Sequence, residues 1–304
     1  MRPHCFSSFG RLSFWAPGLL TLSLVPPASA DLAPRDQAFE TLRRVWAQEK
    51  EITRLRAGES LAMAGEGGPV RAELLAADPL SYPSPARVIA LRVLAHAAGS
   101  AAERAKWIAR IQEIFLDAKA PDRLHALESL AKLGVVPAGT DLEAVRAWTA
   151  AAPEAARPFG HWMLHLAGDP AAQPALLAAL GSADPITRLR AGFALRMIVP
   201  SDATARAAVA AALAKEPSDS PARAYLLSAA LRLRADPAQT GRWREEAVAS
   251  FTLPGRAAAT LELATVITHL EPAPSAQVFL ALLDHPEADA RIGGAKALLG
   301  QGGP

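Results

Sequence analysis

Residues 52–58 read ITRLRAG, and the same seven residues recur unchanged at 186–192. The two copies lie 134 residues apart (186 minus 52), which is close to four times a shorter period that runs through the chain. A fixed period of about 20–50 residues is typical of stacked repeat arrays. The duplicated segment therefore indicates that the chain is built from repeated structural units.

The shorter period is marked by an arginine with a small residue three positions later and a leucine seven positions later. In the first copy these residues are Arg54, Ala57 and Leu61. The eight arginines, called the anchor arginines below, are Arg54, Arg87, Arg123, Arg157, Arg188, Arg223, Arg256 and Arg291. Arg223 alone lacks the small residue and the leucine. The mean spacing of about 34 residues lies within the range of helical repeats.

A proline falls two to five residues before each anchor arginine after the first. These prolines are Pro85, Pro121, Pro153, Pro185, Pro221, Pro254 and Pro286. Proline suits the first turn of a helix, so each anchor is expected to open the second helix of a helix pair. The arginine, the small residue and the leucine then share one helix face. Capping boxes at Ser100–Glu103 and Thr140–Glu143 predict the start of two first helices.

An arginine near a helix N-terminus opposes the helix dipole, at a cost of about 0.3–1 kcal/mol. Eight repetitions of that cost suggest a compensating contact. We expect each anchor arginine to lay its aliphatic stem along the apolar face. Its guanidinium would then bond to carbonyls or to a carboxylate of the adjacent unit. The alternative is a solvated arginine in an arginine-rich composition.

Two units show the pattern most completely. Residues 174–195 contain PALLAAL, then ADP, then RLRAGFAL, and residues 279–298 contain FLALLD, a proline and RIGGAKAL. This order of helix, Asp/Pro turn and Arg-x-x-Ala helix resembles the bacterial HEAT-like (armadillo-type) helical repeat family, over most of residues 40–300. The resemblance implies an all-α protein, a right-handed α-solenoid of about eight HEAT-like helix pairs. Its concave surface would bind another protein or a peptide.

Eight stacked pairs predict an open arc of roughly 70 Å, since packed helices lie about 8–10 Å apart. The ends of such an array need a polar cover. The last anchor helix is followed only by residues 300–304. Lys296 and its neighbours, a partner, or a longer chain would have to cover this end.

The first thirty residues are predicted to be a signal peptide. Arg2 and Arg11 give a positive start, residues 14–25 are mainly apolar, and residues 28–30 read ASA, so cleavage is expected before Asp31. The apolar run is shorter than the roughly 20 residues of a membrane span, although a retained N-terminal anchor is the alternative. The predicted parts are the signal peptide 1–30, the helical array 31–300 and a flexible tail 301–304. We expect an exported bacterial protein, periplasmic or extracellular, without a membrane span after cleavage.

Removal of the signal peptide leaves a neutral chain. The full chain has 32 Lys and Arg against 30 Asp and Glu, and Arg2 and Arg11 lie in the signal peptide, so 30 of each sign remain. Without a basic surplus, nucleic acid is not an expected partner. The single cysteine, Cys5, also lies in the signal peptide, so the mature protein has no disulfide and no thiolate metal site.

No sequence motif identifies an active site. The chain contains no HExxH, phosphate loop, GxSxG or GxGxxG, so no catalytic, cofactor-binding or metal-binding residue is assigned. His161 and His165, with Asp169 beyond, have the i, i+4 spacing of half a metal site. The alternative is that both histidines pack beside Trp162 and Met163.

Other polar and aromatic residues are expected to have structural roles. Asp284, His285 and Asp289 are typical turn residues. His125 and Glu128 form an i, i+3 pair that is expected on the surface. Five tryptophans show no common position relative to the anchors, which favours core packing over a binding groove; they are Trp46, Trp107, Trp148, Trp162 and Trp243.

These observations favour a non-catalytic protein–protein interaction scaffold, or an accessory subunit, in the bacterial envelope. One alternative is a HEAT-like enzyme or enzyme accessory, because some HEAT-like proteins resemble the lyases that attach bilins to phycobiliproteins. Another is a binder of a metal or small ligand that uses His161 and His165.

Overall fold

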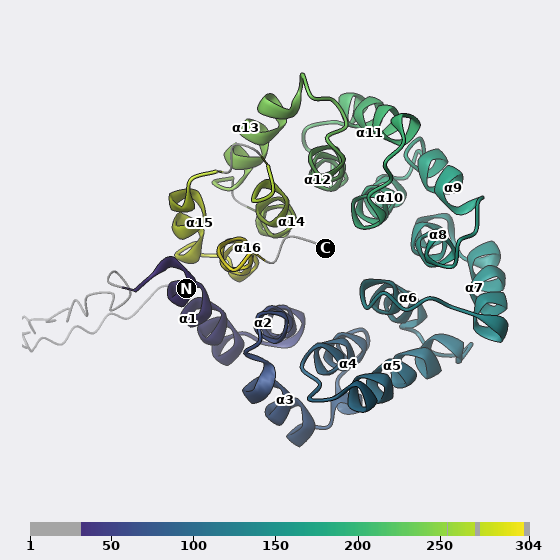
Figure 1. Cartoon of the computed structure of the whole chain (residues 1–304), viewed down its shortest axis with the longest axis vertical. Helices are drawn as coiled ribbons and strands as arrows, with labels where there is room; N and C mark the ends of the chain where they lie inside the picture. The colour runs from purple at the N-terminus through teal and green to yellow at the C-terminus, as the bar shows by residue number, and fades with distance from the viewer. Residues whose placement is uncertain (1–31, 254, 271–273, 301–304) are drawn as a thin grey trace, which may run out of the picture. The chain divides into compact units, whose positions relative to one another are not determined.

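The computed structural model describes residues 32–253, 255–270 and 274–300. These residues form sixteen α-helices and two short 3-10 helices, with no strand among them (Figure 1). The all-α class predicted from the sequence is confirmed. The predicted signal peptide, its cleavage before Asp31 and the predicted tail 301–304 lie outside the described residues.

The helices alternate along the chain between an outer and an inner layer (Figure 1). The outer helices are α1 (Pro34–Gln48), α3 (Gly67–Ala76), α5 (Ala101–Leu116), α7 (Gly139–Ala151), α9 (Ala172–Ala179), α11 (Ala203–Lys215), α13 (Thr240–Ser250) and α15 (Ala276–Leu283). The inner helices are α2 (Glu51–Met63), α4 (Ala86–His96), α6 (Arg123–Lys132), α8 (Arg157–Leu166), α10 (Pro185–Ile198), α12 (Arg223–Leu233), α14 (Ala257–Ile267) and α16 (Ala288–Leu298). The 3-10 helices are η1 (Pro79–Ser81) and η2 (Glu154–Ala156).

The inner helices follow one another around a closed ring. Each inner helix contacts the next one along the chain, and the last, α16, contacts both α1 and α2 (Figure 1). The sequence predicted an open arc, and in this respect the described helices differ from that prediction. Each unit turns relative to the one before it, and eight such turns bring the last pair against the first.

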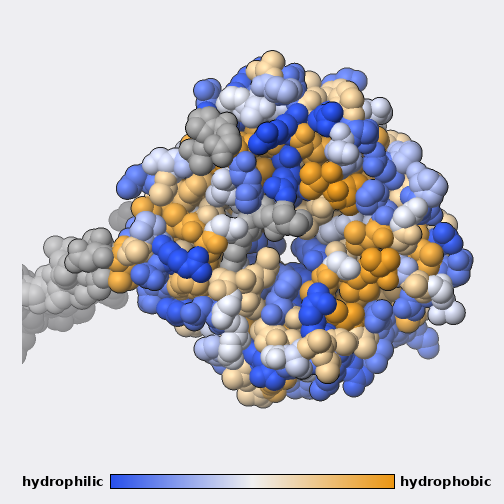
Figure 2. Space-filling model, in the orientation of Figure 1, coloured by the Kyte–Doolittle hydropathy of each residue, from blue (hydrophilic) through white to orange (hydrophobic). Residues whose placement is uncertain are grey.

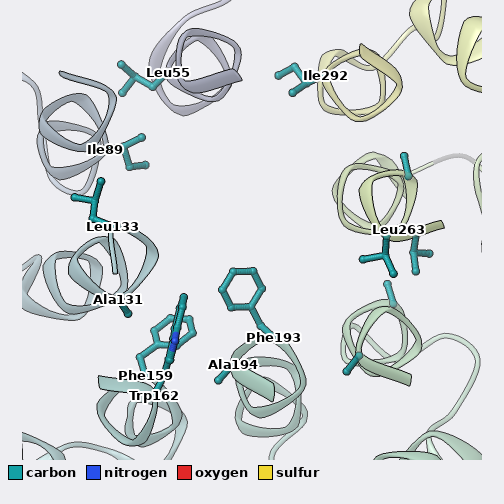
Figure 3. Packing of buried hydrophobic residues seen from close by; sticks show 14 of the residues in the cluster. Leu55, Ile89, Ala131, Leu133, Phe159, Trp162, Phe193, Ala194, Leu263 and Ile292 are labelled. Atoms are coloured by element: carbon teal, nitrogen blue, oxygen red, sulfur yellow. The ribbon is translucent and has the colours of Figure 1, made fainter. Parts of the chain in front are cut away.

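Apolar and polar contacts both hold the seam between the last and first helix pairs. Ile292 is fully buried on α16, and Figure 3 shows it directed toward α2. Arg291 Nη2 donates a hydrogen bond to Glu49 Oε1 at 3.1 Å. Arg56 on α2 forms an ion pair with Asp289 on α16. The last helix pair is therefore covered by the first.

The anchor arginines stand at the start of the inner helices, as the sequence predicts. Seven lie within the first four residues of their helix, and Arg256 is the N-cap residue of α14. The small residue three positions later faces the outer helix of the same pair. A Cβ added at Gly160 would lie 2.1 Å from Thr149 Oγ1 on α7, and one at Gly294 would lie 2.8 Å from the carbonyl oxygen of Phe279 on α15. Close approach of the two helices therefore requires a small residue here.

One of the two predicted capping boxes is present. Ser100 Oγ accepts a hydrogen bond from the Glu103 amide at 3.1 Å, at the start of α5. The other prediction is wrong, because α7 already begins at Gly139 and its N-cap residue, Ala138, makes no side-chain bond. Gly139 adopts a φ of +53°, so the chain enters α7 through a left-handed residue and not through a threonine cap.

The predicted bond to an adjacent unit is confirmed for six of the eight anchor arginines, and the other two, Arg123 and Arg157, bond to carbonyls of their own helix pair. Five anchors pair with a carboxylate of the following helix pair, counted around the ring: Arg54 with Glu73, Arg87 with Asp122, Arg188 with Glu216, Arg223 with Glu246 and Arg291 with Glu49. The other three donate to backbone carbonyls: Arg123 to Phe115, Arg157 to Ala152 and Arg256 to Ser218. Each anchor arginine thus forms a hydrogen bond or ion pair either with another helix pair or with a carbonyl of its own helix pair.

The closed ring predicts the result of small-angle X-ray scattering. A compact chain of the predicted mature length has a radius of gyration of about 19 Å, whereas an open arc of roughly 70 Å would give a larger value. We expect the mature chain to scatter with a value near the compact one. Charge reversal of the seam, for example Asp289→Arg, is expected to increase it. A wild-type value that matches the arc would contradict the closed ring.

Candidate binding site in the central cavity

Side chains from all eight inner helices surround a cavity of about 240 Å³. Figure 2, in the orientation of Figure 1, shows a hollow at the centre of the ring, with hydrophilic residues beside it. The basic lining residues are Arg56, Arg92, Lys132, Arg190, Arg196 and Lys296, and the acidic ones are Glu59, Glu128 and Glu262. Six basic and three acidic groups give the cavity a positive excess, although the predicted mature chain is neutral.

Eleven of the eighteen lining residues stand at two positions of the repeat. Two residues after an anchor stand Arg56, His125, Phe159, Arg190 and Tyr225, and five residues after an anchor stand Glu59, Arg92, Glu128, Phe193, Leu261 and Lys296. Positions three apart share a helix face. This inward-facing pair of positions, called the lining positions below, is distinct from the face that carries the small residue and leucine. The sequence contains this signal, but the anchor pattern alone does not reveal it.

The two copies of ITRLRAG lie on opposite sides of the ring, because α2 and α10 are four places apart among eight inner helices (Figure 1). Their first arginines, Arg54 and Arg188, bond to the following helix pair. Their second arginines, Arg56 and Arg190, both line the central cavity. Each copy of the duplicated segment therefore supplies one arginine that bonds to the following helix pair and one arginine that lines the cavity.

Glu59 and Arg92 form a buried ion pair in the cavity wall. Arg92 Nε and Nη2 donate to the two carboxylate oxygens of Glu59 at 2.6 and 2.9 Å, and Nη1 donates to Ser129 Oγ at 2.7 Å. Burial acts to raise the pKa of Glu59, but the charge and hydrogen bonds of Arg92 outweigh it and leave this pKa well below its ordinary value. Glu59 is therefore ionised, and Arg92 neutralises it.

His125 and Glu128 lie at the cavity and not on the outer surface, which corrects the prediction for this pair. Lys132 Nζ lies 2.6 Å from Glu128 Oε1, and His125 Nδ1 lies 3.6 Å from Oε2. Burial acts to raise the pKa of Glu128, and the charge of Lys132 and the bond from His125 lower it by more. The i, i+3 contact is present, but it faces inward because α6 belongs to the inner layer.

An aromatic cluster forms the cavity wall on α8, α10 and α12. Phe193 stands at its centre, with ring centroids 6.0 Å from Phe159, 5.8 Å from Trp162 and 6.3 Å from Tyr225, all edge-on. Figure 3 shows Phe193 directed into the ring. Lys132 and Arg196 lie over the Phe193 ring, at 5.0 and 4.8 Å from its centroid. Such cation–π contacts hold charged groups at an otherwise apolar wall.

Most basic groups of the cavity are neutralised by a nearby carboxylate. Arg196 Nη2 lies 2.7 Å from Glu262 Oε2, and Arg56 pairs with Asp289. Arg190 is different, because within the described residues its guanidinium bonds only to the Ala155 carbonyl, at 2.7 Å, and stacks over Phe159 at 5.6 Å. Burial lowers the pKa of Arg190, with Glu128 and Asp184 acting in the opposite direction.

Lys296 is the second basic group without a carboxylate partner. It lies half-buried on α16, and no acceptor among the described residues is within hydrogen-bonding or ion-pairing distance of its ammonium. Burial lowers the pKa of Lys296 below its ordinary value, while Glu59 and Glu262 act to raise it and Arg196 and Lys132 act to lower it. Lys296 and Arg190 thus provide the uncompensated positive charge of the cavity.

The histidine pair on α8 does not meet further ligands. His161 and His165 are both half-buried, and burial lowers the pKa of each. Within residues 32–253, 255–270 and 274–300, no group of three or more His, Cys, Asp or Glu side chains is arranged to hold a metal ion. Asp169 acts to raise the pKa of His161 but lies 3.6 Å from Arg146, with which it pairs.

The remaining residues singled out in the sequence have structural contacts. In the turn before α16, His285 Nδ1 accepts from the Glu287 amide at 3.1 Å, and the His285 carbonyl accepts from Arg291. Four of the five tryptophans are buried, with 2–7% exposure, and they are Trp46, Trp107, Trp162 and Trp243. Trp148 packs edge-on against Phe115, 6.2 Å between centroids. Core packing is therefore confirmed for four of the five tryptophans, and Trp148 is partly buried and packs against the core.

None of the helices described here has the length and apolar character needed to cross a membrane. Comparisons of the chain with protein-family models, with curated proteins and with solved structures found no match. The function must therefore be argued from the cavity and its side chains.

Proposed function

We propose that the chain is an exported, non-catalytic binding protein whose binding surface is the inner face of the helix ring. The observation that carries this proposal is the central cavity, to which every inner helix contributes a side chain. In a stacked helical array the inner face is the usual binding surface. Closure of the ring turns that face into the wall of a cavity.

The proposal includes the HEAT-like nature of the repeat and its right-handed solenoid path. Its support is the recurrence of one helix start, an arginine followed by a small residue that faces the outer helix, at a spacing of about 34 residues. The predicted signal peptide supports export to the bacterial envelope or the medium.

The cavity limits what the proposed partner can be. A volume of about 240 Å³ accepts a small molecule or a few residues of extended peptide, but not a folded domain. The scaffold predicted from the sequence is therefore narrowed to a protein that receives a chain segment or a small ligand within the ring.

A cavity-filling variant tests this proposal. Leu189 lines the cavity on α10, so Leu189→Trp adds bulk inside the ring, whereas Leu116→Trp adds the same bulk at an exposed position of α5. Each protein is purified from the compartment to which it is exported. Native mass spectrometry is expected to find an additional mass with the wild type and with Leu116→Trp.

The additional mass should be absent from Leu189→Trp. Circular dichroism and thermal unfolding must show that Leu189→Trp remains folded, and a smaller cavity variant, Leu189→Phe, replaces it if it does not. A mass that stays with the folded cavity variants, or no bound mass on the wild type, would contradict binding in the cavity.

A further inference from the structure

The charge of the central cavity is not balanced by the residues that line it. Arg92 neutralises Glu59, Lys132 neutralises Glu128, and Arg196 neutralises Glu262. Arg56 pairs with Asp289 behind the lining. Among the described residues, Lys296 and Arg190 have no carboxylate within 4 Å, so two positive charges face the cavity without a counter-charge.

Lys296 is placed where a ligand can reach its ammonium. It stands at a lining position of α16, and its neighbours are Glu59 on α2, Glu262 on α14, Arg196 on α10 and Lys132 on α6. Both of these acids are already held by an arginine. The ammonium retains all three of its hydrogen-bond donors, because no described residue accepts from it.

Tyr225 and Arg190 offer further donors at the same cavity. The Tyr225 hydroxyl forms no hydrogen bond with a described residue, and Tyr225 lines the cavity from α12. Burial and the nearby carboxylates of Glu262 and Glu128 raise the pKa of Tyr225, so its hydroxyl keeps its proton and remains a donor. Arg190 uses Nη1 for the Ala155 carbonyl and has other N–H groups left.

We propose that the central cavity binds the oxyanion group, carboxylate or phosphate, of a small ligand, with Lys296 as the main contact and Tyr225 and Arg190 as further donors. This inference rests on the proposed function and adds the chemical class of the ligand. Lys296, Tyr225 and Arg190 line the cavity with donors that no described carboxylate accepts from, and an oxyanion would receive charge-assisted hydrogen bonds from them. Phe193 and Phe159 would face the apolar part of the ligand.

Isothermal titration with inorganic phosphate and with succinate tests the proposal and separates the two oxyanions. At constant ionic strength set with chloride, the wild type is expected to bind at least one of them saturably. Lys296→Met should weaken that binding by about tenfold or more, since a hydrogen bond to a charged group contributes roughly 1.5–3 kcal/mol. Lys215→Met removes an exposed lysine of α11 and should leave the affinity unchanged.

The pH dependence gives a second readout. Because burial places the pKa of Lys296 below its ordinary value, affinity should fall as pH rises through this lowered pKa, earlier than an exposed lysine would lose its proton. Lys296→Arg should remove this loss, because arginine keeps its charge.

The outcomes separate this inference from the proposed function. No saturable binding of either probe, or equal binding by wild type and Lys296→Met, overturns the oxyanion site. If native mass spectrometry nevertheless finds a bound mass on the wild type and not on Leu189→Trp, the proposed function stands without the oxyanion site. Weakening by Lys215→Met to the same extent would show a general charge effect and also overturn the site. Binding lost in Lys296→Met, and reduced in Tyr225→Phe and Arg190→Gln, supports it.

Discussion

Replacement of Arg92 by leucine is expected to reduce the free energy of unfolding by about 3–5 kcal/mol at neutral pH. Arg92 is 4% exposed and donates three hydrogen bonds, two to Glu59 and one to Ser129. Without it, the largely buried Glu59 carboxylate has only His96 within ion-pairing distance among the described residues, at 3.7 Å, and burial lowers the pKa of that histidine. The loss should be measured by urea unfolding.

The double variant Arg92→Leu with Glu59→Leu serves as the control for this mechanism. Removal of both charges is often neutral, so the double variant should recover more than half of the loss. In the wild type the folded pKa of Glu59 lies below its unfolded value. Its stabilising contribution is therefore complete above the unfolded pKa and lost as pH falls through the folded one. The difference between wild type and Arg92→Leu should narrow in acid. A loss below about 1 kcal/mol would mean that water replaces the guanidinium.

The helix pairs and their bonds were predictable because they depend on local spacing. Every unit except that of Arg223 has an arginine, a small residue and a leucine at fixed offsets. These offsets place the small residue of the inner helix toward the outer helix of its pair. Arg87 illustrates this, since its carboxylate partner, Asp122, lies 35 residues further on, one repeat away and directly before the next anchor arginine. Here the bond that the repeat spacing predicts is also the bond that the folded structure forms.

Ring closure was not predictable, because it depends on the angle between successive units. Small changes in that angle accumulate over eight units and decide whether the last pair meets the first. Arg291 shows the consequence: its partner, Glu49, lies 242 residues earlier in the chain. No spacing rule for single helices indicates a contact over that distance.

Identical sequence also does not fix the neighbours of a residue. Gly58 and Gly192 hold equivalent places in the two copies of ITRLRAG, yet Gly58 faces Trp46 and Gly192 faces Leu226.

The candidate site was only partly predictable. Spacing alone correctly paired His125 with Glu128, but it cannot tell whether a helix face points into a cavity or out to solvent, and the pair was assigned to the wrong side. Lys296 lies within the repeat stretch RIGGAKAL, but no sequence motif marks it as a binding residue. Its importance depends on which acids its neighbours already bind, and that is a property of the assembled ring. That basic, acidic and aromatic residues share the lining positions becomes meaningful only once the ring is known.

Replacement of Arg188 by alanine is expected to reduce the free energy of unfolding by about 3 kcal/mol, and a loss below about 0.5 kcal/mol would contradict a structural role for the anchor arginines. Arg188 Nε and Nη2 each donate to a Glu216 oxygen at 2.7 Å, and Nη1 donates to the Ser182 and Ala183 carbonyls. The Glu216 side chain is 2% exposed, so the alanine variant leaves a buried carboxylate whose one remaining hydrogen bond from a described residue comes from Ser220 Oγ.

Arg256→Ala is the matched control, at the same anchor position of a different repeat unit. Arg256 occupies the same anchor position, but among the described residues its side chain makes a single 3.3 Å hydrogen bond, to an exposed carbonyl, and its loss should change stability by less than about 0.5 kcal/mol. The pH dependence of the stability loss further distinguishes Arg188→Ala from Arg256→Ala. Burial acts to raise the pKa of Glu216, and the hydrogen bonds from Arg188 and Ser220 lower it by more, so the folded pKa lies below the unfolded one. The contribution of Glu216 is lost as pH falls through the folded pKa, and the Arg188→Ala difference should shrink there.

A constant difference across that range would mean that the lost stability comes from the carbonyl bonds of Arg188 and not from its ion pair. Arg188→Lys distinguishes these contributions, because lysine keeps the charge but cannot bond both carboxylate oxygens and two carbonyls in one plane. An intermediate loss, which narrows in acid, is the result expected if the bidentate ion pair between adjacent helix pairs carries most of the effect. Arg87 and Arg223 form the same bidentate pair, and Arg54 and Arg291 each donate one bond to a carboxylate, so that result would identify the bond that joins these units to the next around the ring.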